Sequence, residues 1–170
     1  MVIVQTIFFL LLLTTAITDL AYKKIYNFIT IPAMVLGLLG NACFGGWDGL
    51  QLSLIGLLVG GGVFFLIFIF GGIGGGDVKL MAAIGALMGY PFIVGAVFYS
   101  VLVGGLMAII LMIWRNALWS SVKNISLSLY TAFVPGLERV PLNPENSLPV
   151  PYGMAIVLGT LGAWIERYLL

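Results

Sequence analysis

The amino-acid sequence predicts an all-α integral membrane protein, a bundle of six transmembrane helices with a polar cytoplasmic loop. Of its 170 residues, 62% are hydrophobic and 8% are charged, which is too little charge to build a water-exposed surface. A helix needs about 20 apolar residues to cross a bilayer, so this length allows roughly six crossings with short connections. The basic residues also fall almost entirely on one side of such a bundle. We expect a single membrane-embedded domain over residues 1–170.

The first half of the chain contains three predicted helices. The first is the apolar run 1–18, and a polar interfacial segment, 19–27, follows it. The second helix covers 28–44, and its proline lies near its start, where a missing N–H is tolerated. A tight turn at 45–49 leads into the third helix, 50–70, whose glycine cluster predicts close contact with another helix.

The second half begins with a glycine-rich stretch, residues 71–79, between two apolar runs. A short fourth helix continues to residue 89, and a Tyr-Pro pair ends it. The fifth helix is predicted over 92–114 and the last over 154–164. Between them, about 115–149, lies the most polar region, which we expect to be the cytoplasmic loop.

The charges give the orientation. Cytoplasmic loops carry an excess of Lys and Arg, and six crossings with the N-terminus outside place only Arg167 on the outer side. Both termini are then expected outside. The basic residues on the cytoplasmic side are Lys23, Lys24, Lys79, Arg115, Lys123 and Arg139.

Several classes of site are excluded by composition. The sequence has no histidine, which removes Ser-His and Cys-His nucleophile systems and HExxH zinc sites. Cys43 is the single cysteine and lies in an apolar run, so we interpret it as a small buried or lipid-facing residue. The basic residues form no face that would bind nucleic acid. We expect no metal and no cofactor.

The glycine-rich stretch contains the strongest candidate for a functional site. Five of the six residues before Asp77 are glycine, and Lys79 follows two positions later. An ionisable group beside hydrocarbon costs about 3 kcal/mol at a helix centre, so it is a functional-site hypothesis by default. Glycine permits positive φ and close approach of another chain. We therefore expect residues 72–76 to accept an extended substrate backbone.

Topology brings a second carboxylate to the same interface. Asp19 ends the first helix and Asp77 opens the fourth, with two crossings between them. Two aspartates at one depth in a partly dry setting are the ingredients of an aspartic protease, because the pair shares one proton. The ionised member activates water for attack on a peptide carbonyl, and the protonated member hydrogen-bonds the carbonyl oxygen.

Other interpretations remain open at this point. Asp77 can cap the fourth helix, and Asp19 can pair with Lys23 on the next turn. The chain can instead be a small ion- or proton-coupled transporter with the two acids as ion sites, or a structural assembly subunit whose acids only cap helices. Nucleotide binding is excluded, because the glycines lack the GxxxxGK[ST] spacing.

Three stretches resemble the type IV prepilin peptidases. They are the GxGD signature Gly74-x-Gly76-Asp77, the segment from Asp19 to Lys23-Lys24-Ile25-x-Asn27, and the helix entry Pro151-Tyr152-Gly153. The resemblance implies a multi-pass aspartyl endopeptidase of the inner membrane with Asp19 and Asp77 as catalytic residues. Its substrate would be a prepilin or pseudopilin, whose short basic leader it removes on the cytoplasmic side. The other motif residues would support the site or bind substrate.

The chain also departs from the family pattern. It has Ile25-Tyr26-Asn27 where the family often has Ile-Pro-Asn. It lacks the paired Cys-x-x-Cys motifs of larger members, so it resembles the short, peptidase-only type found with Flp/Tad pili, and methyltransferase activity is not expected. Archaeal preflagellin peptidases share the GxGD core and are a close variant.

Two supporting residues have alternative interpretations. Lys79 either adjusts the charge of the aspartate pair or binds a carbonyl, or it is an interface lysine that extends to water. Tyr152 either hydrogen-bonds near an aspartate or belongs to the aromatic belt at the membrane surface.

Overall fold

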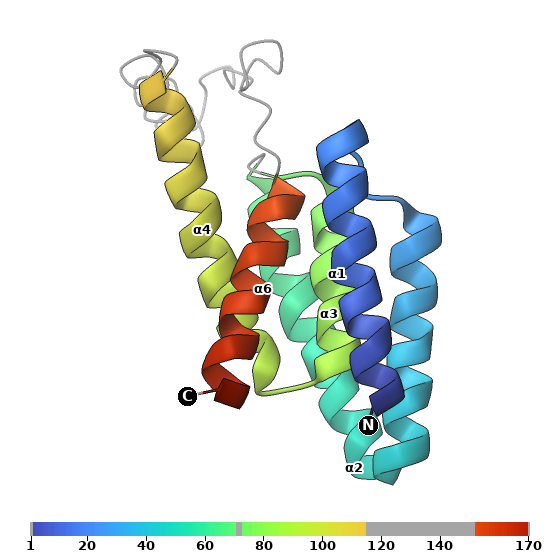
Figure 1. Ribbon diagram of the computed structural model, residues 1–170. Coiled ribbons are helices and arrows are strands. Elements are labelled where there is room, and N and C mark those ends of the chain that lie inside the picture. Colours follow the sequence, from blue (N-terminus) through green and yellow to red (C-terminus); the bar gives the residue numbers. More distant parts are fainter. Residues whose placement is uncertain (1, 71–72, 115–151, 170) are drawn as a thin grey trace, which may run out of the picture. The chain divides into compact units, whose positions relative to one another are not determined.

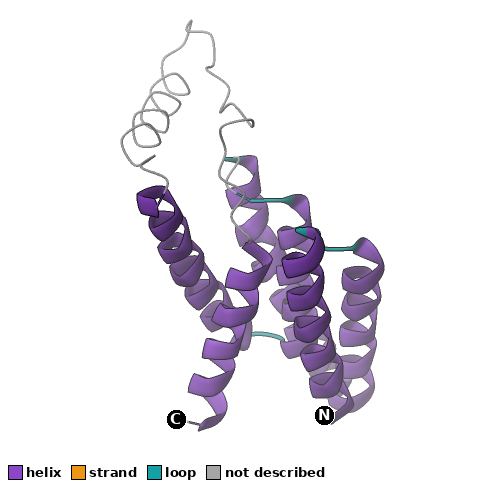
Figure 2. Ribbon diagram, turned by 45° about the horizontal axis from the view of Figure 1, so that its top comes forward, coloured by secondary structure: helices purple, strands orange, loops and turns teal. Residues whose placement is uncertain are grey.

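A computed structural model describes residues 2–70, 73–114 and 152–169, and this part of the chain contains helices and short loops with no strand (Figure 2). The chain divides into two compact units. The first comprises residues 1–104 and 151–170. The second comprises 105–150, of which only the end of one helix, up to residue 114, is described. The surface loop predicted at 115–149 lies outside the described residues.

The described helices agree with the predicted order (Figure 1). The first helix runs past its predicted end, so that Asp19 lies inside its last turn. The last helix extends beyond the predicted 154–164 at both ends. The bounds are α1 Val2–Tyr22, α2 Asn27–Ile69, α3 Gly75–Met88, α4 Phe92–Trp114 and α6 Tyr152–Leu169.

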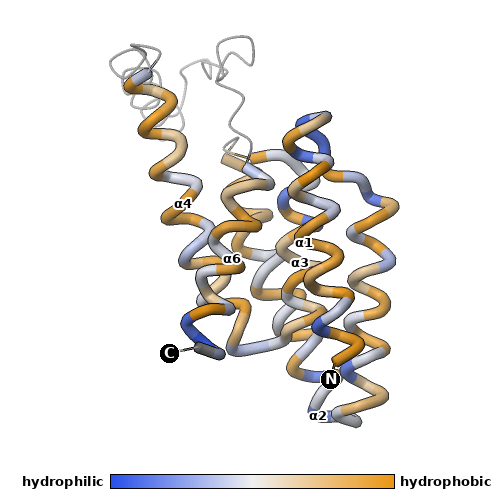
Figure 3. The backbone as a smooth tube through the Cα atoms, in the orientation of Figure 1, coloured by the Kyte–Doolittle hydropathy of each residue, from blue (hydrophilic) through white to orange (hydrophobic). Residues whose placement is uncertain are grey.

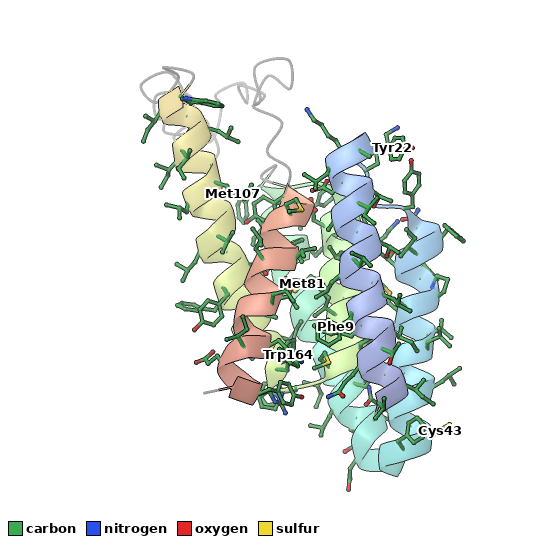
Figure 4. All side chains as sticks on the ribbon, in the orientation of Figure 1. Phe9, Tyr22, Cys43, Met81, Met107 and Trp164 are labelled. Atoms are coloured by element: carbon green, nitrogen blue, oxygen red, sulfur yellow. The ribbon has the colours of Figure 1, made fainter. Side chains whose placement is uncertain are left out.

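The 43 residues of α2 form two helical arms joined by a break. At 1.5 Å per residue a straight helix of this length would measure about 65 Å, twice the thickness of the hydrocarbon core. Gly46 interrupts it with φ 60° and ψ −145°, a backbone conformation suited to glycine. The second arm returns beside the first, and Gly49 approaches the backbone of Asn41. The predicted turn is therefore confirmed. Cys43, beside it, is exposed (Figure 4).

Within the described residues, three helices, α1, α2 and α4, are long and apolar enough to cross a membrane. The 14 residues of α3 span only about 21 Å. The described part is thus a helical, membrane-spanning protein. The prediction of six crossings is not confirmed, because α3 is too short and α6 does not qualify by length and composition.

Helix α3 lies in the middle of the first unit (Figure 1) and contacts α1, both arms of α2, and α6. Every residue from Leu80 to Leu87 is buried. Figure 4 shows Met81 among the surrounding helices, and this side chain has no exposed surface. A short helix with no lipid-facing stripe is held by its neighbours rather than by its own length.

Glycines allow α2 to approach the backbone of α3 closely. A Cβ on Gly37 would lie 2.8 Å from backbone atoms of Ala86 and Leu87, and one on Gly60 would lie 2.7 Å from the Met81 carbonyl. Without a hydrophobic driving force inside a bilayer, small residues of this kind permit the packing that holds helices together. The predicted role of the cluster at 60–62 is confirmed for the first two glycines. It is wrong for Gly62, whose surroundings are open.

Side chains of α2 satisfy the last carbonyls of α3. The Nδ2 of Asn41 donates to the carbonyl oxygens of Ala86 and Leu87, at 3.0 Å each, and to that of Gly37 in its own helix. The Oγ of Ser53 also donates to the Ala86 carbonyl. The last four carbonyls of a helix have no partner within it, and within a membrane no water replaces one. These two polar residues therefore allow α3 to end among apolar neighbours.

We predict that Gly85→Ala destabilises the protein strongly. A Cβ at Gly85 would overlap the backbone of Gly56 in the facing arm of α2, so the two helices must separate. Overpacking of this kind costs about 1–3 kcal/mol. Thermal unfolding in detergent, followed by circular dichroism, should show a lower midpoint. The matched variant Gly62→Ala, whose Cβ meets nothing within 4 Å, should match the wild type or slightly exceed it. Equal midpoints for the two variants would contradict this packing.

The most hydrophilic residues of the first unit lie toward the helix ends (Figure 3). The C-terminal end of α1 and the N-terminal ends of α3 and α6 lie at the same end of the bundle (Figure 1). Toward the opposite end, an edge-to-face contact of Phe9 with Trp164, at 5.3 Å between ring centroids, joins α1 to α6 (Figure 4). The segments that carry the predicted motifs are thus gathered at one end of this unit.

Candidate active site

Asp19 is held by the start of α6. Its side chain is 5% exposed, and its Oδ2 accepts the backbone N–H of Met154 at 2.9 Å. This N–H belongs to the first turn of α6, where donors have no partner within the helix and a negative charge is favoured. Gly153 makes the approach possible, because a Cβ there would lie 2.7 Å from the Asp19 carboxyl. The structure thus brings together two predicted site residues that are distant in the sequence.

Asp77 lies in the first turn of α3 and is 8% exposed. Its Oδ2 accepts the backbone N–H of Gly74, the residue before the helix, at 2.9 Å. This is half of a capping box, since glycine has no side chain to complete the other half. The capping role that was open from the sequence is therefore present in the structure. The capping hydrogen bond uses one of the two carboxylate oxygens of Asp77, Oδ2.

The two carboxyl groups lie close enough to interact electrostatically. Their helices, α1 and α3, contact each other, and α6 contacts both. Within the described residues, no group of three His, Cys, Asp or Glu side chains gathers that could hold a metal ion. The arrangement is a pair of mostly buried acids at one end of a helical core. In each of them a backbone N–H binds Oδ2.

Tyr152 packs inside the first unit beside this pair. Its ring meets Phe64 edge-to-face, with 6.2 Å between centroids, and its hydroxyl lies over Gly104, where a Cβ would come within 2.7 Å of it. The next residue in the chain, Gly153, lies against the carboxyl of Asp19. These contacts favour the interpretation that Tyr152 lies near an aspartate over the interpretation that it belongs to the aromatic belt. No hydrogen bond joins Tyr152 to either acid in the described structure.

The remaining predicted supporting residues meet at the start of α2. The Nζ of Lys79 donates to the Oδ1 of Asn27 at 2.8 Å, and both side chains are exposed. Gly76 lies against Ile25, whose Cβ would be 3.0 Å from a Cβ on that glycine. Gly76 therefore serves close packing.

The predicted start of the fourth helix at Asp77 needs correction, whereas the expectation that residues 72–76 accept an extended substrate backbone stays a prediction. Helix α3 begins at Gly75, so the last two glycines are already helical. Gly74 has φ −86° and ψ 155°, an ordinary extended conformation, and the positive-φ glycines of the described part are Gly46 and Gly89. Burial of α3 overrides the low helix propensity of glycine. Gly71, Gly72 and Pro151 lie outside the described residues.

Three contacts of the site were not predicted. The backbone of Met154 binds Asp19, and Phe64 and Gly104 pack against Tyr152. A backbone donor leaves no mark in a sequence, and a phenylalanine in an apolar helix resembles its neighbours. The Gly104-Gly105 pair was visible, but nothing in the sequence indicated its partner.

The structure thus has the features of a helical membrane protein with a pair of buried carboxyl groups at one end of its core. A comparison of the sequence with models of protein families shows the family. Residues 6–109 match the model of the type IV leader peptidase family, and the chain belongs to that family. This range includes both aspartates and the glycine-rich stretch.

The chain is also similar to a curated relative, the prepilin leader peptidase/N-methyltransferase of Bacillus subtilis (strain 168). The two are 37% identical over 107 residues, which is 59% of this chain and 41% of the relative. The chain thus spans less than half the length of that relative. No solved structure matches the chain significantly.

Proposed function

We propose that this protein is an aspartic-type endopeptidase that removes the basic leader of prepilins or pseudopilins, with Asp19 and Asp77 as its catalytic residues. The observation that carries the proposal is the pair of buried, interacting carboxyls from α1 and α3, within the range that matches the type IV leader peptidase family. The activity in the name of the Bacillus relative supports the substrate class.

The mechanism follows from the arrangement of the two acids. Like charges close together in a dry setting favour a pair that holds one proton between them. The ionised carboxyl takes a proton from water, which attacks the scissile carbonyl, and the protonated carboxyl donates a hydrogen bond to the carbonyl oxygen. Within the described residues the hydrogen bonds of both acids use Oδ2, which leaves Oδ1 for water and substrate. The backbone N–H groups fix the direction of each carboxyl.

The charges of the described residues support a cytoplasmic site. Lys23, Lys24 and Lys79 lie at the end of the bundle that carries the acids, and Arg167 ends α6 at the other. We propose six crossings: α1, the two arms of α2, α3, α4 and α6. Both termini are then outside the cytoplasmic membrane, and a basic leader approaches the acids from the cytoplasm.

The proposal covers peptide hydrolysis alone. The sequence has one cysteine and therefore no Cys-x-x-Cys pair of the kind associated with methylating the new N-terminus. A prepilin would place its apolar helix beside the spans and its basic leader toward the carboxyls. The residues at the cut must be extended, because a protease opens a helix before it cleaves it.

The test is leader removal by the purified protein. We expect the wild-type protein, in liposomes, to shorten a prepilin with a basic leader at one bond, with mass spectrometry giving the mass of the leader and of the mature N-terminus. A control substrate with the same apolar helix and no leader should stay intact. A folded protein that leaves the prepilin uncleaved, or that carries ions across the liposome membrane without cleavage, would overturn the proposal.

A further inference from the structure

The connection between α1 and α2 is bound to the turn that carries Asp19. It consists of residues 23–26, and its first backbone N–H, from Lys23, donates to the Asp19 carbonyl at 2.9 Å. Lys23 has φ 51°, a left-handed conformation uncommon outside glycine, which turns the chain sharply out of α1. Any shift of this connection therefore acts on the last turn of α1.

The connection and the first residue of α2, which directly follows it, contact the first turns of α3 at two points. Ile25 packs closely on Gly76, where a Cβ would lie 3.0 Å from the Ile25 Cβ, and Asn27 accepts a hydrogen bond from Lys79. Asp77 lies between these two α3 residues in the sequence. The anchors thus link the turn that holds one acid to the turn that holds the other, across 52 residues of chain.

We propose that Lys79 is a positioning residue, which acts through Asn27 to fix the α1–α2 connection and so sets the separation of the two acidic side chains. The inference rests on the proposed function. Lys79 does not bind the acids in the described structure; its hydrogen bond goes to Asn27. The ammonium group of Lys79 is exposed, so it could instead donate a hydrogen bond to a substrate carbonyl, and this is the competing role.

Kinetics separate the two roles. We expect Lys79→Met, which keeps an unbranched side chain one atom shorter and removes the donors, to lower kcat about tenfold with KM within about twofold. Asn27→Leu should have the same effect. The double variant should be no worse than either single one, because both remove one interaction. Lys79→Arg, which keeps a charged donor, should recover most of the lost kcat. A raised KM for Lys79→Met, or losses that multiply in the double variant, would overturn the proposal in favour of direct substrate contact.

Limited proteolysis tests the anchor without any peptidase activity. Lys23 and Lys24 are exposed in the connection, so trypsin can cleave there in detergent-solubilised protein. We expect Lys79→Met and Asn27→Leu to raise the cleavage rate at these lysines several-fold. The matched control is Arg167→Met, which removes a cation from the last turn of α6, at the end of the bundle opposite the acids. It should leave the cleavage rate at Lys23 and Lys24 unchanged. An unchanged rate in both variants would overturn the anchor. A wild-type protein without peptidase activity would overturn the proposed function, and an unchanged proteolysis rate would overturn the anchor. The two failures are therefore distinguishable.

Discussion

Asp19→Asn and Asp77→Asn are each expected to lower kcat for leader cleavage by about 10³-fold, which is within the usual range for loss of a positioned acid or base. An asparagine can neither take a proton from water nor donate the acid proton to the carbonyl oxygen. Because the two carboxyls work as one pair, the double variant should be little slower than either single variant. The measurement is the initial rate of leader removal from a purified prepilin.

The asparagine variants also separate catalysis from helix capping. In Asp77→Asn the new amide oxygen can still accept the backbone N–H of Gly74, and in Asp19→Asn it can still accept that of Met154. The thermal midpoint should therefore change little. Asp48→Asn, at an exposed site near the break in α2, is the matched control and should process normally. Normal processing by Asp77→Asn would leave Asp77 a capping residue only.

Composition and topology were enough to predict the helical membrane fold and to place Asp19 and Asp77 at the same end of it. Both inferences depend on properties that a sequence carries directly: the length of apolar runs, the position of charges and the number of crossings between two residues. The break in α2 was also visible, because three glycines and Asp48 interrupt the apolar run there.

Long-range packing determined what the sequence could not predict. Gly60 and Gly62 look alike in the sequence, yet one faces the α3 backbone and the other faces open space. The helix start at Gly75 contradicts local propensity, because the burial of α3 outweighs it. The Lys79–Asn27 bond joins residues from two helix starts, and no periodicity indicates such a pair.

The second large effect is expected from Gly153→Ala. A methyl group there would lie 2.7 Å from Cγ and Oδ2 of Asp19 and 3.1 Å from its Cβ. Such contacts are too short to persist, so something must move. The nearest atoms belong to a side chain rather than to a backbone, and the carboxyl can turn away. That movement breaks the hydrogen bond from Met154 and changes the distance from Asp19 to Asp77.

We therefore expect Gly153→Ala to lower kcat about 100-fold with a smaller change in the thermal midpoint, because a displacement of about 1 Å at a reacting group costs that much. The matched control is Gly162→Ala in the same helix, where a Cβ would meet the Tyr99 ring at an ordinary 3.8 Å, and it should keep normal activity. A large fall in stability without any loss of specific activity would show that the methyl group displaces α6 instead of the carboxyl. Full activity and stability in Gly153→Ala would mean that Asp19 is not held against the start of α6 during catalysis, and the role of the Met154 N–H would then have to be abandoned.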